Sequence, residues 1–149
     1  GFDVYYNHDP FGFTFEYAKG NTGYTFGSTA AKPGYEEIEA EDYVFTAYYT
    51  IGPQFLYANS SLGTTSVSIG RFDDFWPKSY QFFARYDKWD PAIGENNKVN
   101  GYQQDITTLG LNVFFAQTTK FQLNYNYVDN KEPGREIDHQ VLAQFQFGF

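Results

Sequence analysis

The feature that most constrains this chain is a period of two in its apolar residues, which returns along most of the sequence. In FGFTFEYAK, the rings of Phe11, Phe13 and Phe15 alternate with small or polar residues, and KFQLNYNYV alternates in the same way from Phe121 to Tyr127. Successive side chains of a β-strand point to opposite faces of its sheet, so this period is typical of strands with one apolar and one polar face. The chain is therefore predicted to be all-β.

The composition agrees with strands and excludes several classes of protein. Aromatic residues, which favour strands, make up 22% of the chain, with 17 Phe, 14 Tyr and 2 Trp. The formal charge of -8 argues against a nucleic-acid partner, because phosphate neutralisation needs clustered Lys and Arg. There is no Cys for a disulfide or a thiolate metal site. No apolar stretch reaches the roughly 18 residues of a transmembrane helix.

Alternation alone does not distinguish a soluble β-sandwich from a membrane barrel, but the connections between strands do. His8–Pro10 and Ala116–Thr119 are predicted to be short turns, whereas Gly20–Glu39, Pro91–Gln104 and Asn130–Glu136 are longer and polar. Short turns at one end and long loops at the other are typical of outer-membrane barrels. We therefore expect a transmembrane antiparallel up-and-down β-barrel rather than a sandwich.

The closing segment VLAQFQFGF places three aromatic rings on one strand face at the end of the chain. This face is predicted to meet lipid, since a closed barrel satisfies all backbone groups inside a membrane. A terminal aromatic resembles the signature that the assembly machinery of Gram-negative outer membranes reads. We therefore expect the bacterial outer membrane as the location and assign the assembly signal to Phe145, Phe147 and Phe149.

Several segments resemble strands of the phosphate-selective porin O/P family. FARYDKWDP, DITTLGLNVFFAQTTKFQLNYNYVD and HQVLAQFQFGF look like its last strands, and DPFGFTFEYAKG and DYVFTAYYTIG are similar to earlier strands of its C-terminal half. The resemblance implies a sixteen-stranded barrel, of which residues 1–149 supply about seven or eight strands as the C-terminal part of a single barrel domain. The segment Gly52–Lys78 departs most from the family pattern.

The number of crossings bears on whether this chain closes a barrel alone. Counting back from a periplasmic C-terminus gives an odd number, and Gly1–Asn7 is shorter than the roughly 9–11 residues that a crossing needs. Single-chain bacterial barrels normally have an even number. We therefore expect the first strand to pair with residues outside this sequence. The alternative is a complete eight-stranded barrel, with an eighth strand inside Gln54–Phe72.

The polar faces of the strands form the candidate pore wall. By the period of two, Arg85 and Asp87 point into the lumen from one strand, and Arg71 lies near the end of the long Gly52–Lys78 segment, which is long enough to fold into the pore. Rings of charged side chains select ions by sign. The residues predicted to line the pore are Glu16, Arg71, Gln81, Arg85, Asp87, Asn112, Gln122, Asn124, Asn126 and Gln146.

The predicted function is a passive diffusion porin. The family name implies phosphate, and hence an anion-selective channel, but Lys and Arg do not dominate this stretch, so the solute stays open. The alternative is a structural or partner-binding barrel, with a plugged lumen, inside a larger outer-membrane complex. No G-x-S-x-G element, phosphate loop or H-E-x-x-H motif occurs, so we predict neither an enzyme nor a cofactor nor a metal site.

The expected partners are bilayer lipid, lipopolysaccharide and the assembly machinery, with a homotrimer or larger membrane complex as the assembly. The acidic run YEEIEAED, with Glu36, Glu37, Glu39, Glu41 and Asp42, lies near the predicted outer side. Such runs are usually solvated. Their functional interpretation is bridging to lipopolysaccharide by divalent cations, since carboxylate oxygens suit Ca²⁺ and Mg²⁺.

Overall fold

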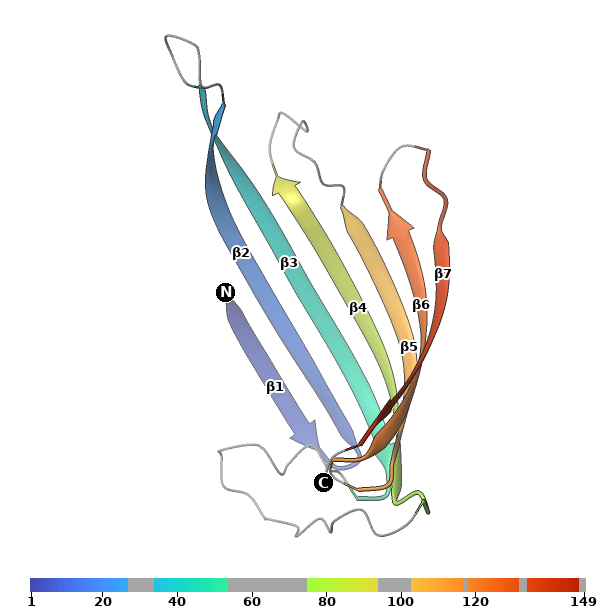
Figure 1. Ribbon diagram of the computed structural model, residues 1–149. Coiled ribbons are helices and arrows are strands. Elements are labelled where there is room, and N and C mark those ends of the chain that lie inside the picture. Colours follow the sequence, from blue (N-terminus) through green and yellow to red (C-terminus); the bar gives the residue numbers. More distant parts are fainter. Residues whose placement is uncertain (27–33, 54–74, 94–102, 117, 132–133, 148–149) are drawn as a thin grey trace.

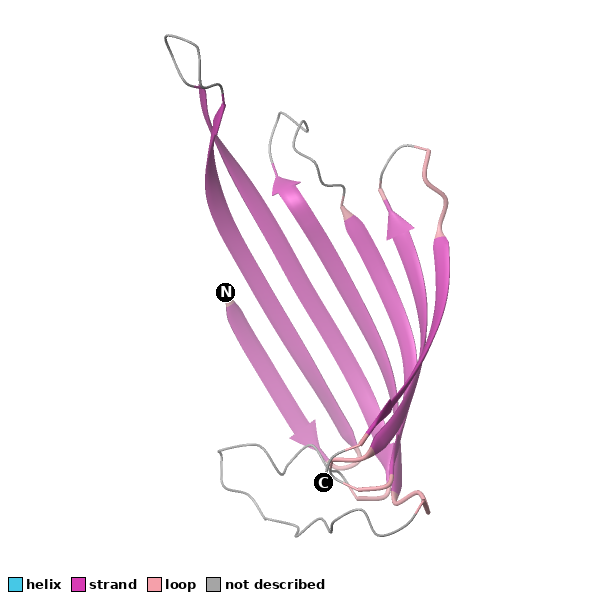
Figure 2. Cartoon of the chain, viewed as in Figure 1, coloured by secondary structure: helices cyan, strands magenta, loops and turns pink. Residues whose placement is uncertain are grey.

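A computed structural model describes residues 1–26, 34–53, 75–93, 103–116, 118–131 and 134–147. These residues form strands joined by turns, drawn as arrows in Figure 2. None of them belongs to a helix long and apolar enough to cross a membrane. The strands are β1 (Phe2–His8), β2 (Phe11–Phe26), β3 (Gly34–Ile51), β4 (Ser79–Ile93), β5 (Gln104–Phe114), β6 (Lys120–Asn130) and β7 (Asp138–Gln146).

The strands form a single 7-stranded sheet in the order β1-β2-β3-β4-β5-β6-β7. Each strand pairs antiparallel with the next one along the chain, so the sheet is a series of hairpins that curves as it proceeds (Figure 1). This is the up-and-down arrangement that short connections between alternating strands favour. The prediction of an all-β antiparallel chain is confirmed.

The connections lie at two opposite ends of the sheet. In Figure 1, β2–β3, β4–β5 and β6–β7 are joined at the upper end, and the C-terminus lies at the lower end with the β1–β2 and β5–β6 connections. The short β5–β6 turn is closed by backbone hydrogen bonds, in which Phe115 N and Ala116 N donate to Thr119 O at 3.0 and 3.2 Å. Both short turns expected from the sequence are present.

The prediction of a long polar loop over Gly20–Glu39 is wrong. Strands β2 and β3 stay paired beyond the apolar residues, with Gly20 opposite Ala40 and the ladder continuing to Phe26 opposite Gly34. The physical reason is that a backbone ladder needs only N–H and C=O groups, so pairing can continue after the apolar alternation has ended. The upper end of the sheet is therefore a long hairpin rather than an irregular loop.

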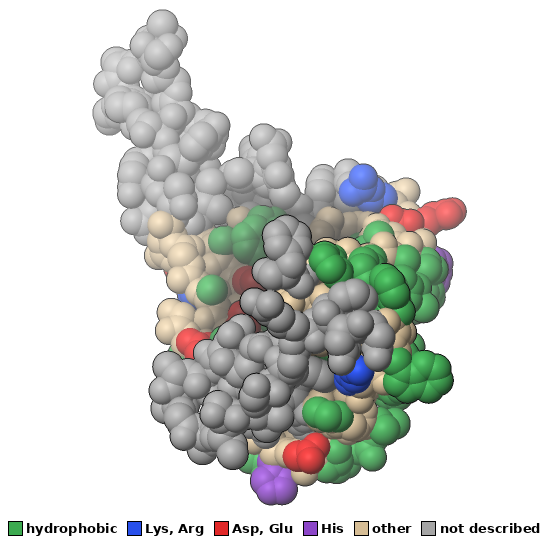
Figure 3. All heavy atoms as spheres, turned by 60° about the horizontal axis from the view of Figure 1, so that its bottom comes forward, with side chains coloured by type: hydrophobic (Ala, Val, Ile, Leu, Met, Phe, Trp, Pro, Cys, Tyr) green, Lys and Arg blue, Asp and Glu red, His purple; other side chains and the backbone are tan. Residues whose placement is uncertain are grey.

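The register places most aromatic residues of the strands on one face, which we call the aromatic face. Directly opposed residues share a face of the sheet, and many pairs along this face join apolar residues, such as Phe15 with Phe45 or Leu111 with Leu123. Figure 3 shows hydrophobic side chains gathered on one side of the molecule. The apolar residues that share this face include Phe11, Phe13, Phe15, Phe45, Leu111, Leu123, Tyr125 and Phe145.

No second sheet covers the aromatic face within the part of the chain that the structure describes. Phe45 is 43% exposed, Leu109 56% and Val141 72%. A sandwich would bury these side chains between two sheets. The sandwich alternative therefore does not describe these residues.

The sheet is not closed. Strand β1 pairs only with β2, and β7 only with β6, so these two strands are the edges of the described sheet. All residues of β7 are exposed. The alternative of a complete eight-stranded barrel expected Gly1–Asn7 to pair with the final strand, and the described residues do not pair in this way. The segment Gln54–Phe72, where the eighth strand was expected, lies outside the described residues.

Candidate functional site

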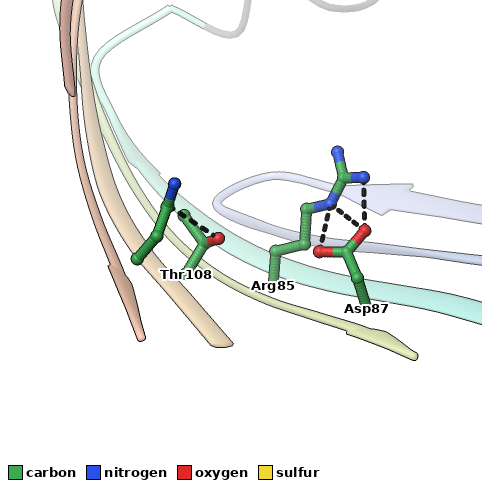
Figure 4. Close-up of polar contacts among 4 residues, drawn as sticks. Arg85, Asp87 and Thr108 are labelled. Atoms are coloured by element: carbon green, nitrogen blue, oxygen red, sulfur yellow. Dashed lines mark hydrogen bonds and ion pairs between the residues drawn. The ribbon is translucent and has the colours of Figure 1, made fainter. Parts of the chain in front are cut away.

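The face opposite the aromatic face is polar and concave, and we call it the polar face. Figure 4 shows Arg85, Asp87 and Thr108 rising from the inner side of the curved sheet. Of the predicted pore-lining residues, Arg71 lies outside the described residues. The register brings the other predicted residues onto this one face: Glu16, Gln81, Arg85, Asp87, Asn112, Gln122, Asn124, Asn126 and Gln146.

A charged cluster lies on the polar face of β2, β3 and β4. Arg85 and Asp87 are two positions apart on β4 and so point the same way. The Nε atom of Arg85 donates to both carboxylate oxygens of Asp87, at 2.8 and 2.9 Å. Glu16 and Asp42 lie near enough to interact electrostatically with the Arg85 guanidinium. Three carboxylates thus surround one cation, and the cluster carries an excess of negative charge.

Asp42 was not among the predicted pore-lining residues. The sequence offered a signal for it, because Tyr43 and Phe45 follow it on the aromatic face, which sends Asp42 to the other side. In the sequence, Asp42 belongs to the acidic run YEEIEAED. The period of two, applied along that run, places its residues alternately on the two faces of the sheet.

The acidic run does not form a single cluster. Glu39 and Glu41 pair with Asn21 and Lys19 on the side of the aromatic face, whereas Asp42 lies on the polar face. Lys19 Nζ lies 2.9 Å from Glu39 Oε2, so one of these carboxylates is already paired with a cation. The described residues contain no group of three or more His, Asp or Glu that could hold a metal ion.

Neutral side chains join neighbouring strands across the polar face. Asn112 Nδ2 donates to Gln81 Oε1 at 2.9 Å, and Gln81 Nε2 donates to Thr50 Oγ1 at 3.4 Å. Farther along, Thr108 Oγ1 donates to Asn126 Oδ1 at 3.0 Å. Gln81 and Asn112 are only 6% and 7% exposed. Buried amides need such partners, so this network stabilises the sheet and makes this part of the polar face uncharged.

A second group of charges lies at the upper end of β5 and β6, where β6 ends. Lys131 Nζ pairs with a carboxylate oxygen of Asp129 and lies 3.2 Å from Asp105 Oδ2. The hydrogen bonds that Lys131 donates to Asp129 and then to Asp105 raise its pKa above the ordinary value. Asp105 is directly opposite Lys88 of β4 and directly opposite Asp129 of β6. These residues therefore share one face of the sheet, which is the aromatic face.

Aromatic rings gather at the lower end of the sheet near the C-terminus. The ring of Phe145 lies 6.4 Å from that of Phe75 and 6.1 Å from that of Phe115, measured between centroids. Phe147 is 50% exposed, and Phe149 lies outside the described residues. Rings of this kind suit a membrane–water interface, but their assignment as an assembly signal stays a prediction.

Comparison with known proteins gives a family match for part of the chain. Residues 78–149 match the family model described as phosphate-selective porin O and P. The matched residues contain β4 to β7, and the similarity that we noted in the upstream segments DPFGFTFEYAKG and DYVFTAYYTIG lies before the match. No curated protein and no solved structure matches the chain.

Proteins of this kind are in general channels of the outer membrane rather than enzymes, and they contact lipid. The strands with one aromatic and one polar face agree with that description. The C-terminal part of the chain, residues 78–149, is therefore similar to the phosphate-selective porin O and P family.

Proposed function

We propose that this protein is a passive diffusion channel of the bacterial outer membrane, and that the described strands are one part of its wall. The observation that carries the proposal is the separation of the two faces across all the strands of one sheet. An exposed aromatic face is favourable against lipid, and a polar concave face is favourable against water. One sheet that meets both media suits a barrel that separates a lumen from a bilayer.

The two edges of the sheet support closure by further strands. Unpaired N–H and C=O groups on β1 and β7 would cost several kcal/mol each in hydrocarbon. We propose that additional strands of a larger barrel domain, of sixteen strands in the family that the chain resembles, pair with these edges. We further propose that the assembly machinery reads Phe145, Phe147 and Phe149. The barrel then contacts lipopolysaccharide and forms a homotrimer or larger complex.

The described wall does not favour phosphate or other anions. On the polar face of the strands, the carboxylates of Asp3, Glu16, Asp42, Asp87 and Asp138 outnumber the cations of Arg85 and Lys120. A wall with more carboxylates attracts cations and repels anions. An anion-selective channel would therefore need basic residues elsewhere in its lumen that outweigh this section.

Planar-bilayer recording of the full-length protein tests the proposal. We expect discrete conductance steps, because a hydrated lumen passes small ions without a conformational cycle. The folded state is verified beforehand by heat-modifiable electrophoretic mobility, and heat-denatured protein is the control. A reversal potential measured in a KCl gradient then gives the sign of the preferred ion.

One result would decide against a channel. If the folded protein inserts into bilayers and never conducts, the lumen is closed, and the alternative of a structural or partner-binding barrel in a larger complex is favoured.

A further inference from the structure

Two aromatic rings lie on the polar face, each beside a glycine of a neighbouring strand. Tyr48 of β3 is directly opposite Gly12 of β2, and Phe83 of β4 is directly opposite Gly110 of β5. Tyr48 and Phe83 are also opposite each other, so one row across four strands reads glycine, tyrosine, phenylalanine, glycine. The two rings lie on adjacent strands, and each has a glycine on its other side.

The rings occupy the space that side chains on these glycines would fill. A Cβ atom added to Gly12 would lie 2.2 Å from both Cζ and Oη of Tyr48. A Cβ atom added to Gly110 would lie 2.1 Å from Cζ of Phe83 and 2.8 Å from Oδ1 of Asn124. Atoms cannot approach so closely, so each ring lies flat over the backbone of its glycine. The tips of the two rings thus point away from each other along the wall.

A ring that lies flat on the wall obstructs less of the lumen than a raised ring, by which we mean one that projects from the wall. Aromatic side chains adopt a few staggered rotamers, and some of these rotamers project the ring away from the sheet. A ring laid over a glycine instead covers backbone and keeps apolar area from water. Both rings are half-buried, in agreement with that position. Glycine is the only residue that leaves this space free.

We propose that Gly12 and Gly110 set the open width of the channel by letting Tyr48 and Phe83 lie flat against its wall. The inference rests on the proposed function as a diffusion channel. A methyl group at either glycine displaces the far end of the ring, which swings off the wall and into the lumen. The backbone need not move, because the atoms in the way belong to the tip of a side chain.

Conductance of Gly12→Ala and Gly110→Ala in the full-length protein tests the inference. We expect folded yield to stay near the wild-type value and single-channel conductance to fall, on the order of 1.2- to 2-fold for one raised ring. Gly20→Ala is the matched control. Gly20 is on the same strand and the same face as Gly12, but a Cβ atom added there meets nothing within 4 Å. Its conductance should equal that of the wild type.

A double variant shows whether the ring is the cause. In Gly110→Ala/Phe83→Ala no ring remains to be raised, so conductance should return at least to the wild-type value. Phe83→Ala alone should change conductance little, since a flat ring obstructs little of the lumen. This single variant retains Gly110 and therefore decides the question even if the alanine variants of the glycines fail to fold.

The outcomes separate this inference from the proposed function. A wild type that conducts, with glycine variants that conduct equally well, overturns the inference alone. A large gain in conductance in Phe83→Ala also overturns it, because the ring would then already stand in the lumen. If the folded wild type never conducts, the proposed diffusion channel is overturned, and the inference about its width falls with it.

Discussion

The two faces of this sheet are made by the same strands and are held together in different ways. On the aromatic face, rings pack against rings. The ring centroids of Phe11 and Tyr49 are 4.9 Å apart, and those of Tyr6 and Phe13 are 5.3 Å apart. On the polar face, side chains are joined by hydrogen bonds and an ion pair, as between Arg85 and Asp87. Below the charged residues at its upper end, the aromatic face is made mainly of rings and aliphatic side chains, whereas the polar face offers water amides and carboxylates.

The contrast between the two faces bears on where the stability of such a sheet comes from. Among the described residues, the buried hydrophobic side chains are only Phe114, Ala116 and Val128. A soluble domain gains most of its stability from a buried apolar core. In the proposed channel, the backbone ladder holds the strands, and lipid on one face and water on the other take the place of a core. The two faces should therefore respond in opposite ways to the same substitution.

The largest effect is expected from one positive charge placed on either side of β6. Leu123 is on the aromatic face and Gln122, its neighbour, is on the polar face. We expect Leu123→Arg to cost about 2–4 kcal/mol and to reduce folding sharply, because the guanidinium would enter hydrocarbon. Gln122→Arg should fold normally. The measurement is folded yield in lipid vesicles by heat-modifiable mobility. Equal yields for the two variants would mean that the faces do not meet different media.

A smaller effect is expected on ion preference when the cation of the charged cluster is removed. Arg85→Gln leaves the carboxylates of Glu16, Asp42 and Asp87 without their guanidinium. The permeability ratio of K⁺ to Cl⁻ should rise, roughly 2-fold, as measured by the reversal potential in a KCl gradient. Lys131→Gln removes the same charge at the end of β6 and should change the ratio little. An unchanged ratio in Arg85→Gln would show that these residues do not face the ion path.

The hydrogen-bonded network of the polar face should contribute modestly to stability. Asn112→Ala removes the bond to Gln81 and leaves a buried amide short of a partner. We expect the free energy of unfolding to fall by about 1–3 kcal/mol, measured by urea titration in vesicles. Gln140→Ala on the exposed β7 is the control, since its bond to Asp138 is open to water. If both variants lose the same stability, burial of the network has no special role.

The smallest effect is expected at Lys131. Its raised pKa means that the charged form is favoured in the folded protein, so its contribution is present at neutral pH and is lost as the pH rises through that raised pKa. Salt should weaken the same contribution, because the group is exposed. The measurement is the difference in urea midpoint between wild type and Lys131→Gln, at low and high salt. A difference that survives high salt would contradict an electrostatic origin.

The sequence by itself determined the strands and the two faces. A period of two can be satisfied only by an extended chain, and it assigns each residue from Phe11 to Phe15, or from Phe121 to Tyr127, to one side. The position of Gln122, Asn124 and Asn126 on one shared face followed from the same rule. The period of two did not predict where the strands end, because β2 and β3 continue as a paired hairpin after the apolar alternation has stopped.

Only the tertiary structure decided which residues of neighbouring strands meet. Periodicity gives the face of a residue but not the register between strands, because sliding one strand by two residues keeps every side chain on its face. The pairing of Gly12 with Tyr48 and of Gly110 with Phe83 depends on that register, as does the gathering of Glu16 and Asp42 around Arg85. The face on which each residue lies was thus predictable from the sequence, and the shape and local charge of the polar face were set by the hydrogen-bonded alignment of the strands.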